Sequence, residues 1–164
     1  MTPFLISRYT RSETAERQPG LKYEQENPPA AVIDNLVRLH NSIIAPIEEC
    51  FFIRIGSGYR CEPVNKMVGG SLTSAHLFGR AADIEPVEET LQRYQELCRW
   101  ITENKIPFDK MILEYGAKEV EGIPAWIHLQ VNKIPGKSRR LVYRICSDTK
   151  QDYIMFDVGK WALC

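Results

Sequence analysis

The sequence has few histidines and no net charge, and these two shortages narrow the classes of protein to which it can belong. Only three of the 164 residues are histidine, whereas the basic and the acidic residues number 21 each. A chain with a formal net charge of zero has no general attraction to nucleic acid or to an anionic membrane. We therefore expect neither as a partner, and we interpret the local basic spot of Lys137, Arg139 and Arg140 as a solvated loop.

The five cysteines are scattered, and no two of them have the Cys-x-x-Cys spacing. Such a set is typical of reduced thiols in a cytosolic protein and speaks against a disulfide framework or a thiolate-rich zinc site. The N-terminus has a short apolar run without a basic leader, so we predict neither a secretory signal nor a transmembrane span. We expect the protein to be cytoplasmic when made.

The periodicity of apolar residues predicts two main helices and several strands. Steps of three and four residues indicate helices over Pro29–Ala45, which Pro46 should end or kink, and over Glu88–Asn104. Segments rich in β-branched and aromatic residues predict strands at 51–55, 81–84, 110–115, 126–131 and 140–146, with 153–158 as a further candidate. Helices and strands do not alternate regularly, which favours a single α+β domain with a central, mostly antiparallel sheet and two main flanking helices.

Three other segments carry specific expectations. Residues 1–29 are polar and turn-rich, and we expect them to form an extension, with Ser12 capping a short helix, packed on a domain of residues 30–164. His40 lies near the edge of the apolar stripe of its helix and is expected at the surface or half-buried. The Gly-rich turn before Arg60 can expose that side chain, and residues 65–73 are expected to form a loop.

Two of the three histidines stand in segments that can share one site with a carboxylate. The stretch Ser74-Ala-His-Leu-Phe-Gly-Arg-Ala-Ala-Asp83 contains His76 and Asp83, and Trp126-Ile-His128 follows it. A sheet that holds the strands of Asp83 and His128 together can present both to one site. Two imidazoles and one carboxylate suit zinc with an open fourth position, where water can be activated. Taken singly, each of the three residues also has an ordinary structural explanation.

The order of several motifs resembles the M15 peptidases, a family of zinc D,D-carboxypeptidases and peptidoglycan endopeptidases, and in particular a subgroup found in phages and prophages. The motifs are Ser57-Gly-Tyr-Arg60, Asn65, Val68-Gly-Gly-Ser71, the His76–Asp83 segment and Trp126-x-His128, so the similarity spans roughly residues 30–131. The resemblance implies a small α+β fold with a central antiparallel sheet, and zinc bound by His76, Asp83 and His128. It also implies a peptidoglycan stem peptide as the partner, reached after release or phage delivery, and a functional role for Arg60.

The general base is where the chain departs from the family pattern. Many members carry Glu or Asp three residues before the final histidine, and this position is Ala125 here. Glu114, on the strand expected at 110–115, and Glu121, in the loop that follows, are the two substitutes. An acidic residue among apolar ones on an interior strand favours Glu114, although an ion pair with Arg60 explains it equally well. Arg60 itself suits either an oxyanion, a substrate carboxylate or a structural salt bridge.

Two functions are compatible with these features. The first is a zinc peptidase that hydrolyses peptidoglycan stem peptides at a D-amino acid, with Ser74, Tyr59 and Trp126 as candidate substrate-binding residues. Trp126 suits packing as well as stacking on a substrate. The second is a metal-binding but weak or inert module of a phage or prophage, with a structural or wall-recognition role. Residues 132–164 contain no motif that indicates a role, and the sequence has no signal for the bond that is cleaved or for the oligomeric state.

Overall fold

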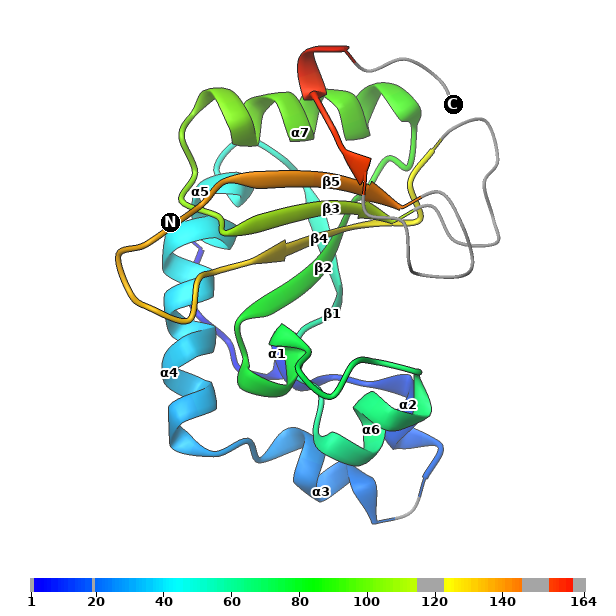
Figure 1. Cartoon of the computed structure of the whole chain (residues 1–164). Coiled ribbons are helices and arrows are strands. Elements are labelled where there is room, and N and C mark those ends of the chain that lie inside the picture. Colours follow the sequence, from blue (N-terminus) through cyan, green and yellow to red (C-terminus); the bar gives the residue numbers. More distant parts are fainter. Residues whose placement is uncertain (1, 19, 115–122, 146–153, 161–164) are drawn as a thin grey trace.

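A computed structural model describes residues 2–18, 20–114, 123–145 and 154–160. Its centre is a six-stranded sheet with the order β1-β2-β4-β3-β5-β6, in which only β3 and β5 run parallel. The strands are β1 (Ile53–Ser57), β2 (Ala81–Pro86), β3 (Lys110–Glu114), β4 (Trp126–Gln130), β5 (Leu141–Ile145) and β6 (Ile154–Met155). The predicted α+β class with a mostly antiparallel sheet is confirmed (Figure 1).

The two faces of the sheet differ in what they contact. One face packs with the helices in a single hydrophobic core that includes Ala82, Ile84, Leu113, Ile127 and Leu129. Successive side chains of a strand point to opposite faces, so Asp83, Ile112 and His128 lie on the other one. These three residues line a cleft, which means that the same alternation builds both the core and the floor of the cleft.

The two predicted helices are present as α4 (Ala30–Leu39) and α7 (Leu91–Glu103). Pro46 does not end the first one, because α4 continues through a π-helix, η1 (His40–Ile44), into α5 (Ala45–Glu48). A proline in a regular helix collides with the carbonyl four residues earlier. In η1 the Ala45 N–H donates to the His40 carbonyl, and this wider turn accommodates the proline ring.

The N-terminal segment forms three short helices, α1 (Ser7–Thr10), α2 (Glu13–Glu16) and α3 (Leu21–Glu26), rather than turns alone. Ser12 caps α2 as predicted, because its Oγ accepts from the Ala15 N–H at 3.2 Å. The Tyr9 hydroxyl lies 2.8 Å from His40 Nδ1, and His40 is only 1% exposed. The expectation of a surface or half-buried His40 is therefore wrong, because the N-terminal segment covers it. The boundary between an extension and a domain at residues 29 and 30 stays a prediction.

Three further elements complete the described chain: α6 (Glu62–Met67), η2 (Ala75–Phe78) and η4 (Val158–Lys160). Helix α6 occupies the start of the segment that was expected to be a loop from Asn65. Figure 1 shows α6 and the short N-terminal helices gathered at one end of the molecule, away from α7. No helix in the described ranges has the length and apolar character needed to cross a membrane.

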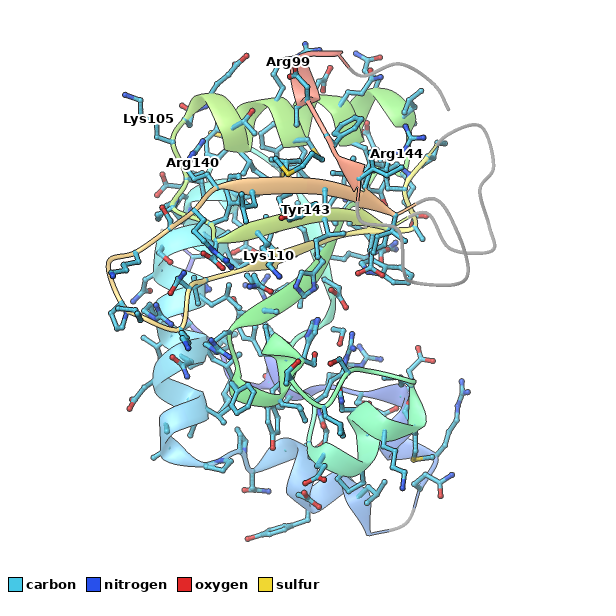
Figure 2. The ribbon with its side chains drawn as sticks, in the orientation of Figure 1. Arg99, Lys105, Lys110, Arg140, Tyr143 and Arg144 are labelled. Atoms are coloured by element: carbon cyan, nitrogen blue, oxygen red, sulfur yellow. The ribbon has the colours of Figure 1, made fainter. Side chains whose placement is uncertain are left out.

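The basic spot of Lys137, Arg139 and Arg140 is not simply a solvated loop. Arg139 pairs with the buried Asp109 at 2.6 Å. The Arg140 guanidinium donates to the Thr102 carbonyl at 2.5 Å, and Figure 2 shows this arginine beside the end of α7. Two of the three cations therefore stabilise the fold, since they bind a buried carboxylate and a carbonyl of the last helical turn.

Candidate metal centre

His76, Asp83 and His128 converge on one point, although 45 residues of sequence separate Asp83 from His128. Asp83 Oδ1 lies 2.9 Å from His128 Nδ1 and 3.2 Å from His76 Nε2, and the two nitrogens are 3.1 Å apart. In a tetrahedral zinc site with metal–nitrogen distances of about 2.0–2.1 Å, neighbouring ligand atoms lie about 3.3–3.4 Å apart. The three atoms thus form nearly one face of such a tetrahedron, and the donor set fits zinc.

The sheet register places two of the three side chains. Asp83 on β2 pairs directly with His128 on β4, so both project from the same face at adjacent positions. Both side chains are almost fully buried, with exposed fractions of 8% for Asp83 and 10% for His128. Buried charged groups are retained only where they are paired or bind a metal. The pairing of β2 with β4 therefore creates the centre.

His76 reaches the centre from η2, the 3-10 helix that precedes β2. Ser74 caps this helix through its Oγ, which accepts from the His76 N–H at 3.4 Å, and Gly79 ends it with φ +64°. A Cβ at position 79 would lie 2.5 Å from the Val32 carbonyl oxygen, so glycine is required both for the conformation and for the space. The tight turn directs the His76 ring back over the start of β2.

Hydrogen bonds on the outer nitrogens assign the tautomers of both imidazoles. His76 Nδ1 lies 2.6 Å from the Gly58 carbonyl oxygen, which can only accept, so Nδ1 carries the proton and Nε2 offers a lone pair. His128 Nε2 lies 3.3 Å from Gln130 Oε1, which likewise requires a proton on Nε2. Both inner nitrogens are thereby available as ligands, and fixing the outer proton in this way is typical of metal-binding histidines.

The protonation of the metal-free centre follows from the same contacts. Burial lowers the pKa of His76, and the nearby Asp83 only partly opposes this effect. Burial also disfavours charge on His128, but the hydrogen bond and negative charge of Asp83 outweigh it and raise the pKa of His128. The pKa of Asp83 lies well below its usual value because the two imidazoles overcome the effect of its burial. Asp83 thus stabilises a proton on His128 Nδ1, at the position that suits a cation.

Zinc affinity is expected to rise with pH through the neutral range and then level off. Below the raised pKa of His128, a proton on Nδ1 competes with the metal, whereas above it the nitrogen is already free. The apparent affinity should therefore increase by about tenfold per pH unit on the acidic side. Competition with a chelator between about pH 5.5 and 8.5 measures this dependence. An affinity that does not change with pH would contradict the assignment of His128 Nδ1 as a ligand.

Arg60 is held against the centre, although its glycine-rich turn could also expose the side chain. Its Nη2 donates to Asp83 Oδ2 at 2.6 Å, and its Nε donates to Ser57 Oγ at 2.8 Å. A register shift at Gly56 brings Ser57 opposite Asp83. The Ser57 hydroxyl therefore lies within hydrogen-bond distance of the Arg60 guanidinium. Since Arg60 uses one oxygen of Asp83, the other oxygen faces the two imidazoles. The arginine therefore orients a ligand and adds a permanent positive charge beside it.

The centre lies in a cleft of about 770 Å³ whose lining includes Lys110, Glu114 and Trp126. Glu114 on β3 is paired with Trp126 on β4, and Ile112 is paired with His128. Glu114 thus projects from the face of His128 at a diagonal position, where Cα atoms in antiparallel strands are about 7–8 Å apart. Its charge helps to raise the pKa of His128. Lys110, which is labelled in Figure 2, lies at the other end of the face of β3 that lines the cleft.

The three predicted substrate-binding residues all line the cleft, but they differ in what they offer. Ser74 is half-buried and caps η2. Tyr59 is only 6% exposed, and its N–H donates to the Tyr9 carbonyl at 2.7 Å. Trp126 is half-buried, and its Nε1 is buried without a hydrogen-bond partner among the described residues. Contact of all three with substrate stays a prediction. Glu121, the alternative base, lies outside the described residues.

Several residues that shape the centre were given no role by sequence reasoning, although some of them stand in the motifs named above. They are Ser57, the Gly58 carbonyl, Gln130 and Asp109. Gln130 stands two residues after His128 on the same strand, so strand alternation predicts that both side chains lie on one face. The Gly58 carbonyl has no such signal, because its role depends on the backbone. A Cβ at position 58 would lie 2.5 Å from the Tyr9 carbonyl oxygen, so only glycine permits this close approach.

These features define a class: an α+β protein with a buried two-histidine, one-carboxylate metal set on the floor of a cleft. The chain belongs to the peptidase M15 family, whose model matches residues 11–114. The matched range includes Arg60, His76, Asp83 and Glu114, and it ends before His128. Membership of this family supports a hydrolytic peptidase. A comparison with curated proteins found no match for the chain.

Proposed function

We propose that this protein is a zinc-dependent peptidase that hydrolyses peptide bonds in the stem peptides of bacterial peptidoglycan, at a D-amino acid. The observation that carries the proposal is the triangle of His76, Asp83 and His128 on the floor of the cleft. Its fit to zinc and the match to the M15 family support the metal and the reaction class. The cleft volume, about 770 Å³, lies in the range of about 300–1,000 Å³ that is usual for ligand sites.

The centre supplies the metal-dependent part of the reaction. Zinc held by this set would lower the pKa of a bound water to about 7 and polarise the scissile carbonyl. Arg60 fixes Asp83 through Oδ2, and its guanidinium contributes positive charge where an oxyanion develops. His76 Nδ1–H donates to the Gly58 carbonyl, and His128 Nε2–H donates to Gln130 Oε1. Because the inner nitrogens hold the metal, neither histidine is available as the general base.

Glu114 is the residue to which we assign the role of general base. It projects from the same sheet face as His128, one strand away, and it lines the cleft. The Ala125 N–H donates to the Glu114 carbonyl at 2.7 Å, so the neighbouring strand places Glu114 next to the position that carries an acid in many family members. The carboxylate of Glu114 takes the proton of the attacking water and delivers it to the leaving amine, which then departs neutral.

Hydrolysis of peptidoglycan fragments by the zinc-loaded protein is the test of this proposal. We expect the protein to release amino acids or peptides from purified peptidoglycan or from D-Ala-D-Ala peptides. Mass spectrometry detects these products, and all-L peptides of equal length should release none. Treatment with a chelator should abolish the activity, and zinc should restore it. Tight zinc binding without hydrolysis of any stem peptide would instead support an inert metal-binding module, the alternative with which Ala125 is also compatible.

A further inference from the structure

We propose that Gln130 is a positioning residue for the metal ligand His128 and that Asp109 and Arg139 hold Gln130 in place. The inference rests on the metal-binding part of the proposed function and does not depend on the substrate. It concerns a series of hydrogen-bonded side chains that runs from the metal centre to the segment after β4. The inference follows from which group donates and which accepts in each of these hydrogen bonds.

Gln130 has contacts of opposite polarity at the two ends of its amide. Its Oε1 lies 3.3 Å from His128 Nε2, and its Nε2 donates to Asp109 Oδ2 at 3.3 Å. An ionised carboxylate can only accept a hydrogen bond, so the NH₂ group must face Asp109 and the carbonyl oxygen must face His128. The amide orientation is thereby determined, and the oxygen selects the tautomer in which His128 Nδ1 is the metal ligand.

Asp109 is a rigid anchor for this amide. It is only 2% exposed, and it accepts from Asn132 Nδ2 at 2.6 Å and from Arg139 Nη2 at 2.6 Å. Its backbone N–H donates to the Gln130 carbonyl at 2.7 Å, which ties the same two residues together a second time. The Arg139 guanidinium is the main reason that the pKa of Asp109 is lowered to about 2, so the carboxylate is ionised at neutral pH.

The two histidine ligands therefore differ in how they are held. His76 is oriented by the backbone carbonyl of Gly58, which no side-chain substitution removes directly. His128 is oriented by the side chain of Gln130, so its support can be removed without changing a ligand. A partner of this kind fixes the ring and raises the basicity of the metal-binding nitrogen, and its loss typically weakens metal affinity by about 10–100-fold.

The test compares zinc binding in three variants. Gln130→Met keeps the length of the side chain but removes both hydrogen bonds, so its zinc Kd should increase by about 10–100-fold. Asp109→Asn places an NH₂ group where Asp109 accepts hydrogen bonds, and this group opposes the donors of Arg139 and Gln130. It should release the Gln130 amide and increase the zinc Kd as well, by no more than Gln130→Met does. Gln92→Met, on the exposed surface of α7, is the matched control and should bind zinc normally.

Chelator competition gives the Kd of each variant, and the absorption spectrum of the cobalt(II) form reports the geometry around the metal. We expect the spectrum to change in Gln130→Met and in Asp109→Asn and to stay unchanged in Gln92→Met. A wild-type Kd and spectrum in Gln130→Met would overturn the inference, and a wild-type Kd in Asp109→Asn would overturn the anchoring role of Asp109. A wild-type protein that binds no zinc would overturn the proposed function as well, whereas zinc binding without hydrolysis would leave this test fully informative.

Discussion

Replacing His128 with alanine is expected to abolish tight zinc binding and, with it, all peptidase activity. His128 is one of three protein ligands, and its Nδ1 lies 2.9 Å from Asp83 Oδ1 and 3.1 Å from His76 Nε2. Zinc sites with four protein ligands contribute roughly 10–16 kcal/mol, so one ligand accounts for roughly 2.5–4 kcal/mol, or about 10²–10³-fold in affinity. Metal analysis after gel filtration, together with chelator competition, measures the loss.

The third histidine provides a control for this substitution. His40 is buried away from the centre, where it lies 2.8 Å from the Tyr9 hydroxyl and 2.8 Å from the Thr2 carbonyl. His40→Ala should lower the melting temperature, because it leaves buried polar groups without partners, and it should keep the wild-type zinc Kd. The assignment of the centre fails if His128→Ala retains full zinc affinity while His40→Ala loses it.

Replacing Glu114 with glutamine is expected to lower kcat by about 10²–10⁴-fold, the usual contribution of a general base, with little change in zinc affinity. Glutamine has the same shape as glutamate but cannot take a proton from water. The variant therefore separates proton transfer from metal binding. Steady-state rates of the zinc-loaded protein on a stem peptide, combined with a zinc Kd for the same sample, measure both quantities.

Two further variants make this second experiment decisive. Glu121→Gln removes the alternative base and should leave kcat unchanged if Glu114 has the role that we assign to it. Adding Ala125→Glu to Glu114→Gln returns an acid to the position three residues before His128 and should recover part of the lost rate. Full activity in Glu114→Gln, or a large loss in Glu121→Gln, would overturn the assignment of Glu114.

The sequence was a good guide to the centre because its ligands lie on strands. Strand alternation places Ile127 and Leu129 in the core and His128 on the opposite face, and the structure confirms this arrangement. Glu114 lies on the strand expected at 110–115, and the structure pairs this strand with that of His128. Periodic burial is a local property, so a short stretch of residues is sufficient to reveal it.

The errors have a common physical cause, which is contact between segments that are distant in the chain. His40 is buried because Tyr9 and the backbone of Thr2 cover it, and nothing near residue 40 encodes that cover. The glycine-rich turn of Arg60 allows an exposed side chain, but the distant Asp83 holds it at the centre. The helical stretch that begins with α4 continues through η1 and α5 past its expected end at Pro46, because a π-helix precedes the proline. Simple periodicity does not include this irregularity.

The amino-acid order alone determined the types of side chain available for chemistry, the class of fold and the face of each strand on which those side chains lie. These properties depend on residue identity and on spacing along the backbone. The tertiary structure decided which nitrogen of each imidazole faces the metal position, since that choice depends on acceptors supplied by Gly58 and Gln130. A hydrogen bond is short and directional, so only folding, which brings the acceptor to within about 3 Å of the ring, makes the choice.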